Sequence, residues 1–369
     1  MKIAILGTRG IPNHHGGFEQ FAEFFSVFLV NQGHQVYVYN STLHPYKESN
    51  YNGVNLIYCK DYEDKIGTAG QFFYDYNCII NARKHDFDII LQLGYTSSSV
   101  WHKFMPKKPI IITNMDGLEW KRSKYNKYVR RFLKYAEKLA VHSSDYLISD
   151  SIGIQEYLFK TYNKESEYIA YGADCFLSPN EKILDLYKVE REQYNILIAR
   201  FEPENNLETI LDGASKAKNK VKFLVIGKHD VNSFGEYLKD KYKADDHIKF
   251  LGGIYDIEHL NNLRYFSNLY FHGHSVGGTN PSLLEAMASN SLIVANDNIF
   301  NKAILETDAF YFENSEQVSE YIDTLHKLEY SSLSKNLNKK IENTYSWDII
   351  NNQYLEFFKK VMTKKNQLD

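Results

Sequence analysis

The stretch that does most to decide the fold is residues 274–288, which read HSVGGTNPSLLEAMA. Gly277 and Gly278 allow the backbone to approach a ligand closely. Asn280 is a favourable N-cap residue and Pro281 suits the first position of a helix. The apolar residues that follow supply a helix face for a hydrophobic core. The stretch therefore predicts a glycine-containing turn that leads directly into a buried helix.

A turn of this kind binds anions, because the free N–H groups of the first helical turn and the helix dipole both face the ligand. We expect Thr279, Asn280 and Ser282 to contact a diphosphate, together with the two glycines. Glu285 lies one turn into the helix, where its carboxylate can reach the hydroxyls of a ribose. The alternative is a plain loop and a capped core helix, which explains the apolar residues but neither the paired glycines nor Glu285.

This segment resembles the nucleotide-sugar signature of the family-4 glycosyltransferases, which have the GT-B fold. Their signature carries two glutamates separated by seven residues; Glu285 matches the second, and Gly277 stands where the first would be. The run GGTNPS resembles the form found in a subgroup of bacterial rhamnosyltransferases that build cell-wall and capsular polysaccharides. The resemblance implies a nucleotide-sugar donor and a chemistry that needs no metal.

Length and composition limit the possible classes of protein. At 369 residues the chain exceeds the usual size of a single hydrophobic core, so two domains are expected. The net charge of −3 argues against a nucleic-acid-binding protein. Three cysteines without CxxC spacing argue against a disulfide framework or a zinc ribbon. Without a signal peptide or a bilayer-spanning apolar run, we expect a cytoplasmic protein, at most peripheral on the inner face of the cell membrane.

Both halves of the chain alternate apolar strands with amphipathic helices, the pattern of parallel α/β layers. The strands expected in the first half are residues 3–6, 36–39, 89–93, 110–113 and 146–148. Those expected in the second half are residues 195–199, 223–226, 248–251, 269–271 and 292–295. Helices are expected at residues 18–30, 207–216 and 282–288. The fold class is therefore α/β, with two doubly wound Rossmann-like domains.

The turn-rich stretch 171–192 marks the join between the halves. We expect an N-terminal, acceptor-side domain over residues 1–172 and a C-terminal, nucleotide-sugar-binding domain over residues 173–345. The resemblance implies that the two domains face each other across a cleft, as in the GT-B architecture. A final helix within residues 346–369 is expected to cross back to the first domain.

The first strand is followed by the loop GTRGIPNHHGGFE, residues 7–19, which lacks the GxGxxG dinucleotide fingerprint. It resembles the GGxE loop that family-4 enzymes place against the donor diphosphate and the acceptor. Gly16 and Gly17 permit close backbone approach at a helix start, and Glu19 suits the first helical turn. Arg9 can meet phosphate charge.

Polar residues follow three further strand ends, where ligands bind in open α/β sheets. After residues 110–113 come Met115, Asp116 and Glu119; the two acids could contact acceptor hydroxyls or cap a helix. Many family-4 enzymes have a histidine at the position of Met115 that touches the sugar 6-hydroxyl. An apolar Met115 suits a 6-deoxy sugar, whose C6 is a methyl group.

Two other residues are candidates for the reacting centre. Asp150 follows the strand at residues 146–148 and could orient an acceptor hydroxyl or stabilise positive charge; it could equally be the N-cap of the next helix. Tyr171 lies at the junction of the two halves, where its hydroxyl could reach the anomeric carbon.

In the second half, Arg200 and Asn205 stand where the family usually offers an arginine and a lysine to the diphosphate. Arginine can bind phosphate through two parallel hydrogen bonds. Gly227, Ile254 and Tyr255 follow the next two strands and are expected to bind the base. His272 and His274 have the spacing for two ligands on one strand face, but no third ligand is apparent, so we expect no metal.

We expect a helix over residues 120–139, which combine basic and aromatic side chains with a single acid, Glu137. This composition suits the surface of an anionic bilayer, and a lipid-linked acceptor would make such docking useful. A solvated charged face over an aromatic core contact is the alternative.

These observations lead to one expected function and three alternatives. We expect a retaining glycosyltransferase that moves L-rhamnose from dTDP-β-L-rhamnose onto a lipid-linked or growing bacterial cell-surface glycan. The alternatives are a UDP- or GDP-sugar donor, a sugar-nucleotide epimerase of the same fold, and a non-catalytic nucleotide-sugar binder.

Overall fold

The computed structural model describes residues 1–122, 125–275 and 279–367. The chain divides into two compact units. The first unit contains Met1–Lys121, Tyr125–Tyr171 and the segment that begins at Trp347. The second contains Arg122 and Gly172–Ser346.

The first unit is built on an eight-stranded sheet with the order β3-β4-β2-β1-β5-β6-β7-β8. All neighbouring strands are parallel except the short antiparallel pair β3 and β4. The strands are β1 Lys2–Leu6, β2 Gln35–Ser41, β3 Asn50–Tyr51, β4 Val54–Cys59, β5 Ile89–Leu93, β6 Ile110–Asn114, β7 Tyr146–Ser149 and β8 Glu167–Tyr168.

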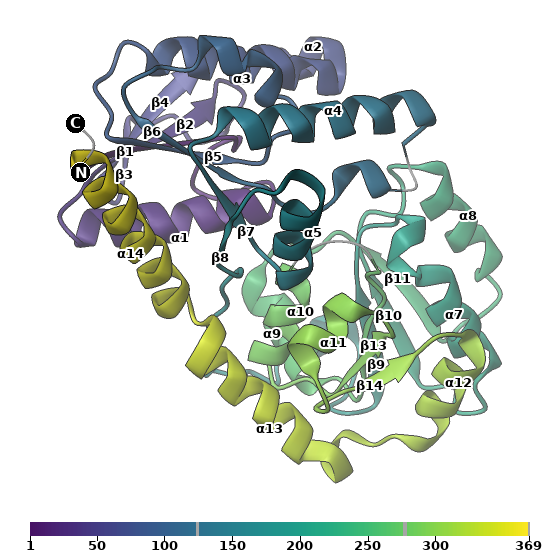
Figure 1. The fold of residues 1–369 in the computed structure, drawn as a ribbon. Helices are drawn as coiled ribbons and strands as arrows, with labels where there is room; N and C mark the ends of the chain where they lie inside the picture. The colour runs from purple at the N-terminus through teal and green to yellow at the C-terminus, as the bar shows by residue number, and fades with distance from the viewer. Residues whose placement is uncertain (123–124, 276–278, 368–369) are drawn as a thin grey trace. The chain divides into compact units, whose positions relative to one another are not determined.

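Helices cover both faces of this sheet, with α3 and α1 on opposite faces in Figure 1. They are α1 Gly17–Asn31, α2 Glu63–Ile66, η1 Gly67–Ala69, α3 Gly70–Ala82, η2 Ser99–Phe104, η3 Glu119–Lys121, α4 Lys127–Ser143, α5 Ile152–Tyr162 and α14 Trp347–Asn366. The last helix packs on α1 through aromatic rings: Tyr354 lies 4.7 Å from Phe21 and 5.0 Å from Phe25 between centroids. These contacts make the end of the chain part of the first unit.

The second unit has a fully parallel six-stranded sheet with the order β11-β10-β9-β12-β13-β14. The strands are β9 Tyr194–Ile198, β10 Lys222–Ile226, β11 Ile248–Gly252, β12 Tyr270–His272, β13 Ile293–Asn296 and β14 Phe310–Phe312. Numbered within the unit, this order is 3-2-1-4-5-6, that of a Rossmann fold.

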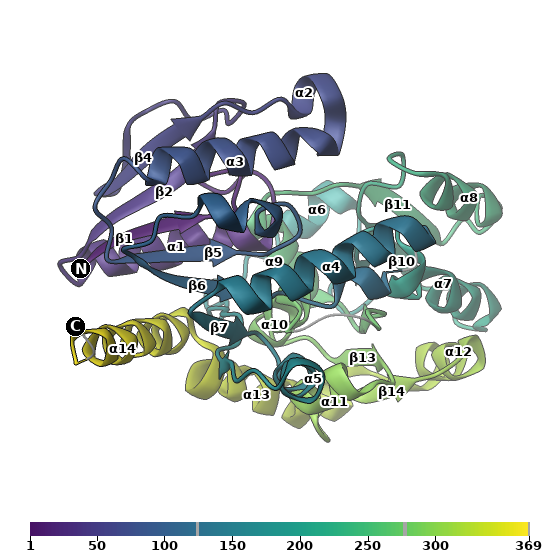
Figure 2. The same cartoon turned by 45° about the horizontal axis from the view of Figure 1, so that its top comes forward.

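The helices of the second unit sit in two layers. Figures 1 and 2 show α7, α8 and α12 on one face of the sheet and α9 and α10 on the other. The bounds are α6 Ile183–Tyr187, η4 Pro203–Asn205, α7 Leu207–Lys216, α8 Ser233–Lys241, α9 Ile257–Phe266, α10 Pro281–Ala288, α11 Ile299–Leu305, α12 Ser315–Thr324, η5 Lys327–Tyr330, α13 Ser331–Lys340 and η6 Ile341–Tyr345. The core between the sheet and the first layer is aliphatic and aromatic, as in Val225, Phe271 and Phe312.

All ten expected strands are present, with ends within two residues of the expectation. One expected element is wrong: residues 120–139 are not a single helix. The structure has the short helix η3 and then α4, which begins at Lys127 because Asn126 caps it by accepting hydrogen bonds from the backbone N–H groups of Tyr128 and Val129. In the part of the chain that the structure describes, no helix is long and apolar enough to cross a membrane.

Candidate functional site

The topology identifies one position in each sheet where ligands are expected. In an open α/β sheet, a crevice forms beyond the carboxyl ends of two neighbouring strands whose connections leave in opposite directions. In the first unit these strands are β1 and β5, and in the second they are β9 and β12. The residues that follow β9 and β12 include Arg200 and the stretch that begins at Gly273. The motifs singled out in the sequence therefore flank these two switch points.

The start of α10 is built as expected. Asn280 is the N-cap, and its side-chain oxygen accepts a hydrogen bond from the backbone N–H of Ser282 at 2.9 Å. Pro281 is the first helical residue, and Thr279 just before the cap is buried. Gly277 and Gly278, the expected backbone approach to a ligand, lie outside the described residues.

Glu285 has a partner that the sequence did not reveal. Its Oε2 accepts a hydrogen bond from Nη2 of Arg264, 2.5 Å away, and the Glu285 side chain is 18% exposed. Arg264 comes from α9, and its side chain is only 1% exposed. The one signal in the sequence was an arginine between Leu263 and Tyr265 in an otherwise apolar helix end.

Arg200 and Asn205 have different surroundings although both follow β9. Arg200 is exposed, and among the described residues no carboxylate pairs with its guanidinium. Asn205 is buried and donates a hydrogen bond from Nδ2 to the backbone carbonyl of Arg200 at 2.8 Å. Asn205 therefore stabilises the turn that carries Arg200, while Arg200 keeps its full capacity to bind phosphate.

The imidazole rings of His272 and His274 stack 4.5 Å apart with an interplanar angle of 16°. Burial lowers the pKa of His272 well below its usual value, and burial together with the positive charges of Arg200 and Arg122 lowers the pKa of His274 to about 3. Both rings are therefore neutral at physiological pH. Within the described residues, no group of three or more His, Cys, Asp or Glu side chains is arranged to hold a metal ion.

The ends of β10 and β11 carry the residues expected near the base. At Gly227 the backbone φ is +152°, and a Cβ atom would lie 2.1 Å from the carbonyl oxygen of Ala199. Only glycine allows this approach of β9 and β10. Tyr255 is 71% exposed, and Nζ of Lys228 lies 5.4 Å from its ring centroid. Ile254, beside it, is half-buried, so an apolar and an aromatic side chain adjoin at this edge.

In the first unit, two carboxylates hold the loop after β1. Arg9 donates to Glu63 through both Nε and Nη2, each at 2.8 Å. The backbone N–H of Arg9 donates to the buried carboxylate of Glu19 at 2.8 Å. Arg9 is therefore engaged by Glu63, and the carboxylate of Glu19 holds the loop that precedes Gly16.

Gly16 and Gly17 form the junction between this loop and α1. Gly16 is the N-cap in an extended conformation and contributes no capping side chain, and Gly17 is the first residue of the helix. The hydroxyl of Tyr171 lies 3.1 Å from the carbonyl oxygen of Gly17 and 3.0 Å from Oε1 of Gln20. The structure therefore brings Tyr171 to the first turn of α1, next to the glycine pair.

Another buried acid lies near the same loop. Asp75 on α3 accepts a hydrogen bond from the hydroxyl of Ser97 at 2.5 Å. Burial raises the pKa of Asp75 to about 7, so the folded protein holds a proton there at mildly acid pH.

The turn after β6 carries Met115, Asp116 and Glu119. Met115 is only 2% exposed and belongs to a hydrophobic cluster with Tyr95 and Leu118. Asp116 has a φ of +50°, a left-handed conformation that costs energy for a residue other than glycine. Such strain is common at binding and catalytic sites. Glu119 begins η3, directly after this turn.

Asp150 follows β7, and the structure assigns the helix cap to its neighbour. Ser151 is the N-cap of α5, and its side chain accepts a hydrogen bond from the backbone N–H of Ile154 at 3.3 Å. The capping interpretation of Asp150 is therefore wrong. Asp150 lies close enough to Tyr354 for its charge to help raise the pKa of that phenol, after the larger effect of burial.

Glu137 is the centre of a buried hydrogen-bond cluster. It is 1% exposed and accepts from Trp120 and Lys134, each at 2.9 Å, and from Tyr157 and Tyr162, each at 2.6 Å. Nζ of Lys134 also lies 4.5 Å from the Trp120 ring centroid. Lys134 is therefore paired with Glu137 in this cluster, and its charge does not belong to the exposed basic surface of α4.

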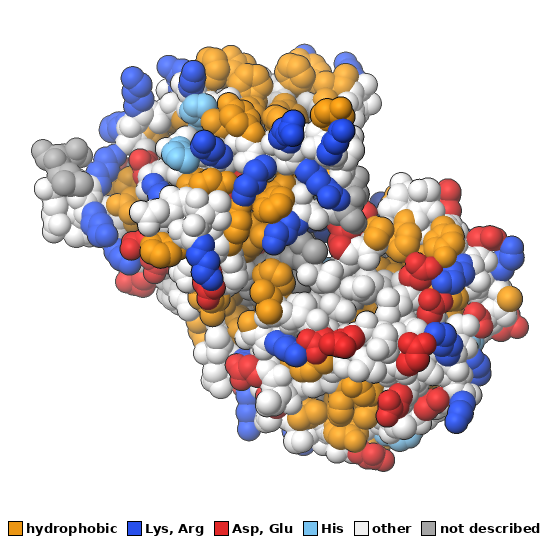
Figure 3. Space-filling view, turned by 45° about the vertical axis from the view of Figure 1, so that its right-hand side comes forward, with side chains coloured by type: hydrophobic (Ala, Val, Ile, Leu, Met, Phe, Trp, Pro, Cys, Tyr) orange, Lys and Arg blue, Asp and Glu red, His pale blue; other side chains and the backbone are white. Residues whose placement is uncertain are grey.

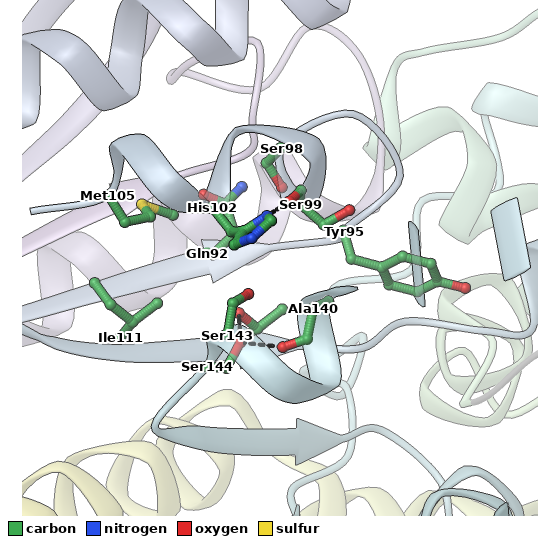
Figure 4. Close-up of a pocket in the computed structure, with 11 residues that line it drawn as sticks. Gln92, Tyr95, Ser98, Ser99, His102, Met105, Ile111, Ala140, Ser143 and Ser144 are labelled. Carbon is green, nitrogen blue, oxygen red and sulfur yellow. Dashed lines mark hydrogen bonds between the residues drawn. The ribbon is translucent and has the colours of Figure 1, made fainter. Parts of the chain in front are cut away.

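A cavity inside the first unit is too small for a donor. Its volume is about 10 Å³, and it is lined by Gln92, Ser99, Thr113 and Ser144 among others (Figure 4). This is close to the smallest space that holds one water molecule. A nucleotide sugar needs a far larger site, so this cavity does not compete with the switch points as the donor site.

Comparisons with known proteins agree with the architecture. Over nearly its whole length the chain is similar to sucrose-phosphate synthase from Thermosynechococcus elongatus, with a TM-score of 0.79, 15% identity and coverage of 98% of this chain and 99% of that one. It is also similar to HepE from Anabaena in complex with UDP-glucose, with a TM-score of 0.73, 14% identity and coverage of 98% and 100%. WaaG, a glycosyltransferase involved in lipopolysaccharide biosynthesis, matches with a TM-score of 0.68, 14% identity and coverage of 96% and 98%. The two parallel-sheet units form a GT-B fold.

Family models divide the chain in nearly the same place as the structure. Residues 180–347, nearly all of the second unit, match the model of the glycosyl transferases group 1. Residues 1–174 match a domain of unknown function, DUF1972. No curated protein matches the sequence.

Proposed function

We propose that the protein is a retaining glycosyltransferase that moves a sugar from a nucleoside diphosphate to a bacterial cell-surface glycan. The observation that carries this proposal is the set of groups beside the β9–β12 switch point: exposed Arg200, the capped start of α10 and Glu285. A guanidinium and a helix N-terminus suit a diphosphate, and a carboxylate one turn further on suits a ribose. The glycosyl transferases group 1 match over the same unit supports this assignment.

The donor we propose is dTDP-β-L-rhamnose. The resemblance of GGTNPS to the rhamnosyltransferase form supports a 6-deoxy sugar. Met115 is apolar as well, but it is buried in a hydrophobic cluster and offers little surface to a sugar methyl group. A UDP-sugar is the second candidate, because HepE was captured with UDP-glucose. A panel of dTDP-rhamnose, UDP-glucose and GDP-mannose, assayed for hydrolysis and transfer, separates the two. Turnover confined to the UDP or GDP donors would overturn the rhamnose assignment.

The reaction replaces one bond at the anomeric carbon with another. The bond from this carbon to the diphosphate oxygen breaks, and a bond to the acceptor oxygen forms on the same face, which retains the configuration. The departing diphosphate takes the proton of the acceptor hydroxyl. Arg200 and the first turn of α10 stabilise the negative charge that grows on the diphosphate in the transition state.

In the first unit, we assign Asp150, Asp116, Glu119 and Tyr171 to the acceptor and the reacting centre. Asp150 does not cap α5, since Ser151 does. Its place directly after β7, where ligands bind in open α/β sheets, supports a role in orienting an acceptor hydroxyl or in favouring an oxocarbenium-like transition state. The left-handed backbone of Asp116 is consistent with a residue held for function. Gly16 and Gly17 would let the start of α1 approach the donor closely.

We also propose that the acceptor is lipid-linked and that α3 and α4 contact an anionic membrane. Figure 3 shows basic and hydrophobic side chains intermingled on the first unit where these helices lie. The exposed aromatic residues there are Phe73, Tyr128, Phe132 and Tyr135, and the exposed basic residues of α4 include Lys127, Arg130 and Arg131. The rings of Phe72 and Phe132 are 5.7 Å apart, so the two helices share one surface. Aromatic and basic side chains together favour the interface of an anionic bilayer.

Two experiments distinguish this function from its alternatives. An epimerase would convert the donor in the absence of any acceptor, which proton NMR of the nucleotide sugar would detect. A non-catalytic binder would bind the donor tightly and transfer nothing to any lipid-linked acceptor. Transfer with retained anomeric configuration, without epimerised donor, supports the proposal over both.

A further inference from the structure

Arg264 has no part in the proposed chemistry. Its guanidinium is almost completely buried, yet it reaches from α9 to α10. Nη1 donates to Oδ1 of Asn261 at 3.1 Å, and Nη2 donates to Oε2 of Glu285 at 2.5 Å. Nη2 also lies 3.4 Å from the hydroxyl of Ser282.

The surroundings of this pair leave little freedom for either side chain. The hydroxyls of Ser282 and Tyr270 are 2.8 Å apart, which ties the first turn of α10 to β12. The backbone carbonyl of Arg264 accepts hydrogen bonds from the hydroxyls of Ser267 and Ser291, at 2.8 and 3.1 Å. Both ends of Arg264 are therefore fixed, and its guanidinium has one available orientation toward Glu285.

A buried ion pair contributes little net stability, because the loss of hydration offsets most of the attraction between the charges. The clearest effect of the pair between Arg264 and Glu285 is that it fixes the orientation of the Glu285 carboxylate. Arg264 engages Oε2, and no described donor engages Oε1 of the same carboxylate. A carboxylate held in this way presents its second oxygen in one orientation, which lowers the entropy cost of binding a hydroxyl.

We propose that Arg264 is a positioning residue for nucleotide binding: it holds the Glu285 carboxylate so that Oε1 accepts a hydrogen bond from a ribose hydroxyl. This inference rests on the proposed function, in which Glu285 binds the ribose. It adds a specific role for a residue that cannot touch the ligand itself, since its guanidinium is buried behind the carboxylate.

The test compares UDP with 2′,3′-dideoxy-UDP by isothermal titration calorimetry and repeats each titration with dTDP and 2′,3′-dideoxy-dTDP, the nucleotides of the proposed donor. The wild-type protein should bind UDP at least tenfold more tightly, as expected for the loss of a hydrogen bond to a charged group. Arg264→Met should weaken UDP binding by about tenfold and leave binding of the dideoxy analogue unchanged. The double variant Arg264→Met, Glu285→Ala should then bind UDP no more weakly than Glu285→Ala alone, because the two residues act through one contact.

Two controls separate this role from a general loss of stability. Lys340→Met removes another ion pair of the same unit, between Lys340 and Glu306 at 2.8 Å, and should alter neither titration. If thermal melting shows that Arg264→Met does not fold, Arg264→Lys replaces it. Lysine keeps the charge but lacks the planar fork, so this variant should also reduce the preference for UDP over the analogue.

The outcomes identify which proposal fails. Equal weakening of UDP and its dideoxy analogue in the folded Arg264 variant would show a purely structural role and overturn this inference. If the wild-type protein binds neither UDP nor dTDP more tightly than the matching dideoxy analogue, Glu285 does not contact the ribose, and the proposed function is refuted at that residue. A preference for UDP that survives both Arg264 substitutions would also overturn the inference, while leaving the ribose contact of Glu285 intact.

Discussion

The side-chain amide of Asn114 donates a hydrogen bond to the hydroxyl of Tyr354 at 2.9 Å, although 240 residues separate the two in the chain. The other end of the same amide accepts a hydrogen bond from the backbone N–H of Asp116 at 3.0 Å. Through Asn114, the last helix of the chain thus supports the left-handed turn after β6. Both Asn114 and Tyr354 are buried, so this link lies away from competing water.

Removing the Tyr354 hydroxyl should therefore destabilise the first unit. Tyr354→Phe leaves the buried amide of Asn114 without an acceptor, which should cost about 1–3 kcal/mol in the free energy of unfolding. Denaturant unfolding measures this change. Tyr128→Phe, at a residue that is 70% exposed, is the matched control and should be silent. A Tyr354→Phe variant as stable as the control would show that the hydrogen bond adds nothing.

Arg200→Lys should impair turnover. Lysine keeps the positive charge but loses the planar pair of donors that matches a diphosphate, so kcat should fall by roughly tenfold or more. Asn205 will still hold the turn, since it contacts only the backbone carbonyl of Arg200. Steady-state kinetics with a saturating donor measure the effect. Wild-type kcat in this variant would rule out a bidentate role for Arg200.

Asp150→Asn should depress kcat much more than donor affinity, the mark of an interaction made mainly in the transition state. The cap of α5 should stay intact, because Ser151, and not Asp150, forms it. Ser151→Ala is the contrasting variant: it should cost about 1 kcal/mol of stability with a smaller effect on kcat. Normal turnover by Asp150→Asn would refute the catalytic assignment. Tyr171→Phe should show the same kinetic pattern more mildly.

Membrane binding should depend on three residues of α4. Reversing the charges of Lys127, Arg130 and Arg131 to glutamate should abolish sedimentation with anionic vesicles, and salt should weaken the binding of the wild-type protein. Lys134 is left unchanged because Glu137 engages it.

The control for this experiment reverses an equal number of exposed charges on the second unit, at Lys218, Lys335 and Lys339. This variant should still sediment with the vesicles. Equal loss of binding in both variants would indicate a response to net charge alone, and binding that ignores salt would contradict the proposed surface.

The free energy of unfolding should depend on pH through the titration of Asp75. Burial raises the pKa of Asp75 to about 7, whereas an unfolded aspartate titrates near 3.9. Between these values the folded state holds a proton that the unfolded state lacks, so stability should fall as the pH rises from about 4 to about 7. Asp75→Asn should flatten this part of the profile of melting temperature against pH. The exposed control Asp64→Asn should retain it, and a slope that persists in Asp75→Asn would assign the titration elsewhere.

The sequence predicts more of the fold than of the candidate site. Buried parallel strands are short apolar runs, and residues 89–93 and 110–113 have that form. Strand β4, Val54–Cys59, was not expected, because Asn55 interrupts its apolar character. The break before α4 was also missed, although Asn126, its cap, is a strong N-terminal signal by itself.

The partners of the candidate residues could not be predicted. Glu63 and Arg264 are distant in sequence from Arg9 and Glu285, and nothing in their local patterns marks them as ion-pair partners. Side-chain pairs of this kind arise from the packing of whole elements, which a single sequence does not specify. The cap of α5 shows the same limit at short range, since Asp150 and Ser151 are both good capping residues and only the backbone geometry selects Ser151.

The place of α14 in the first unit has a consequence for synthesis on the ribosome. Gly172–Ser346 must all be translated before Trp347 emerges, so the second unit is made while the first is still incomplete. At about 5–20 residues per second, that interval lasts roughly 10–35 s. Throughout it, Phe21 and Phe25 lack the rings of Tyr354 and Phe358 that later cover them. The nascent chain therefore presents an apolar helix face to chaperones for the time needed to make an entire second domain.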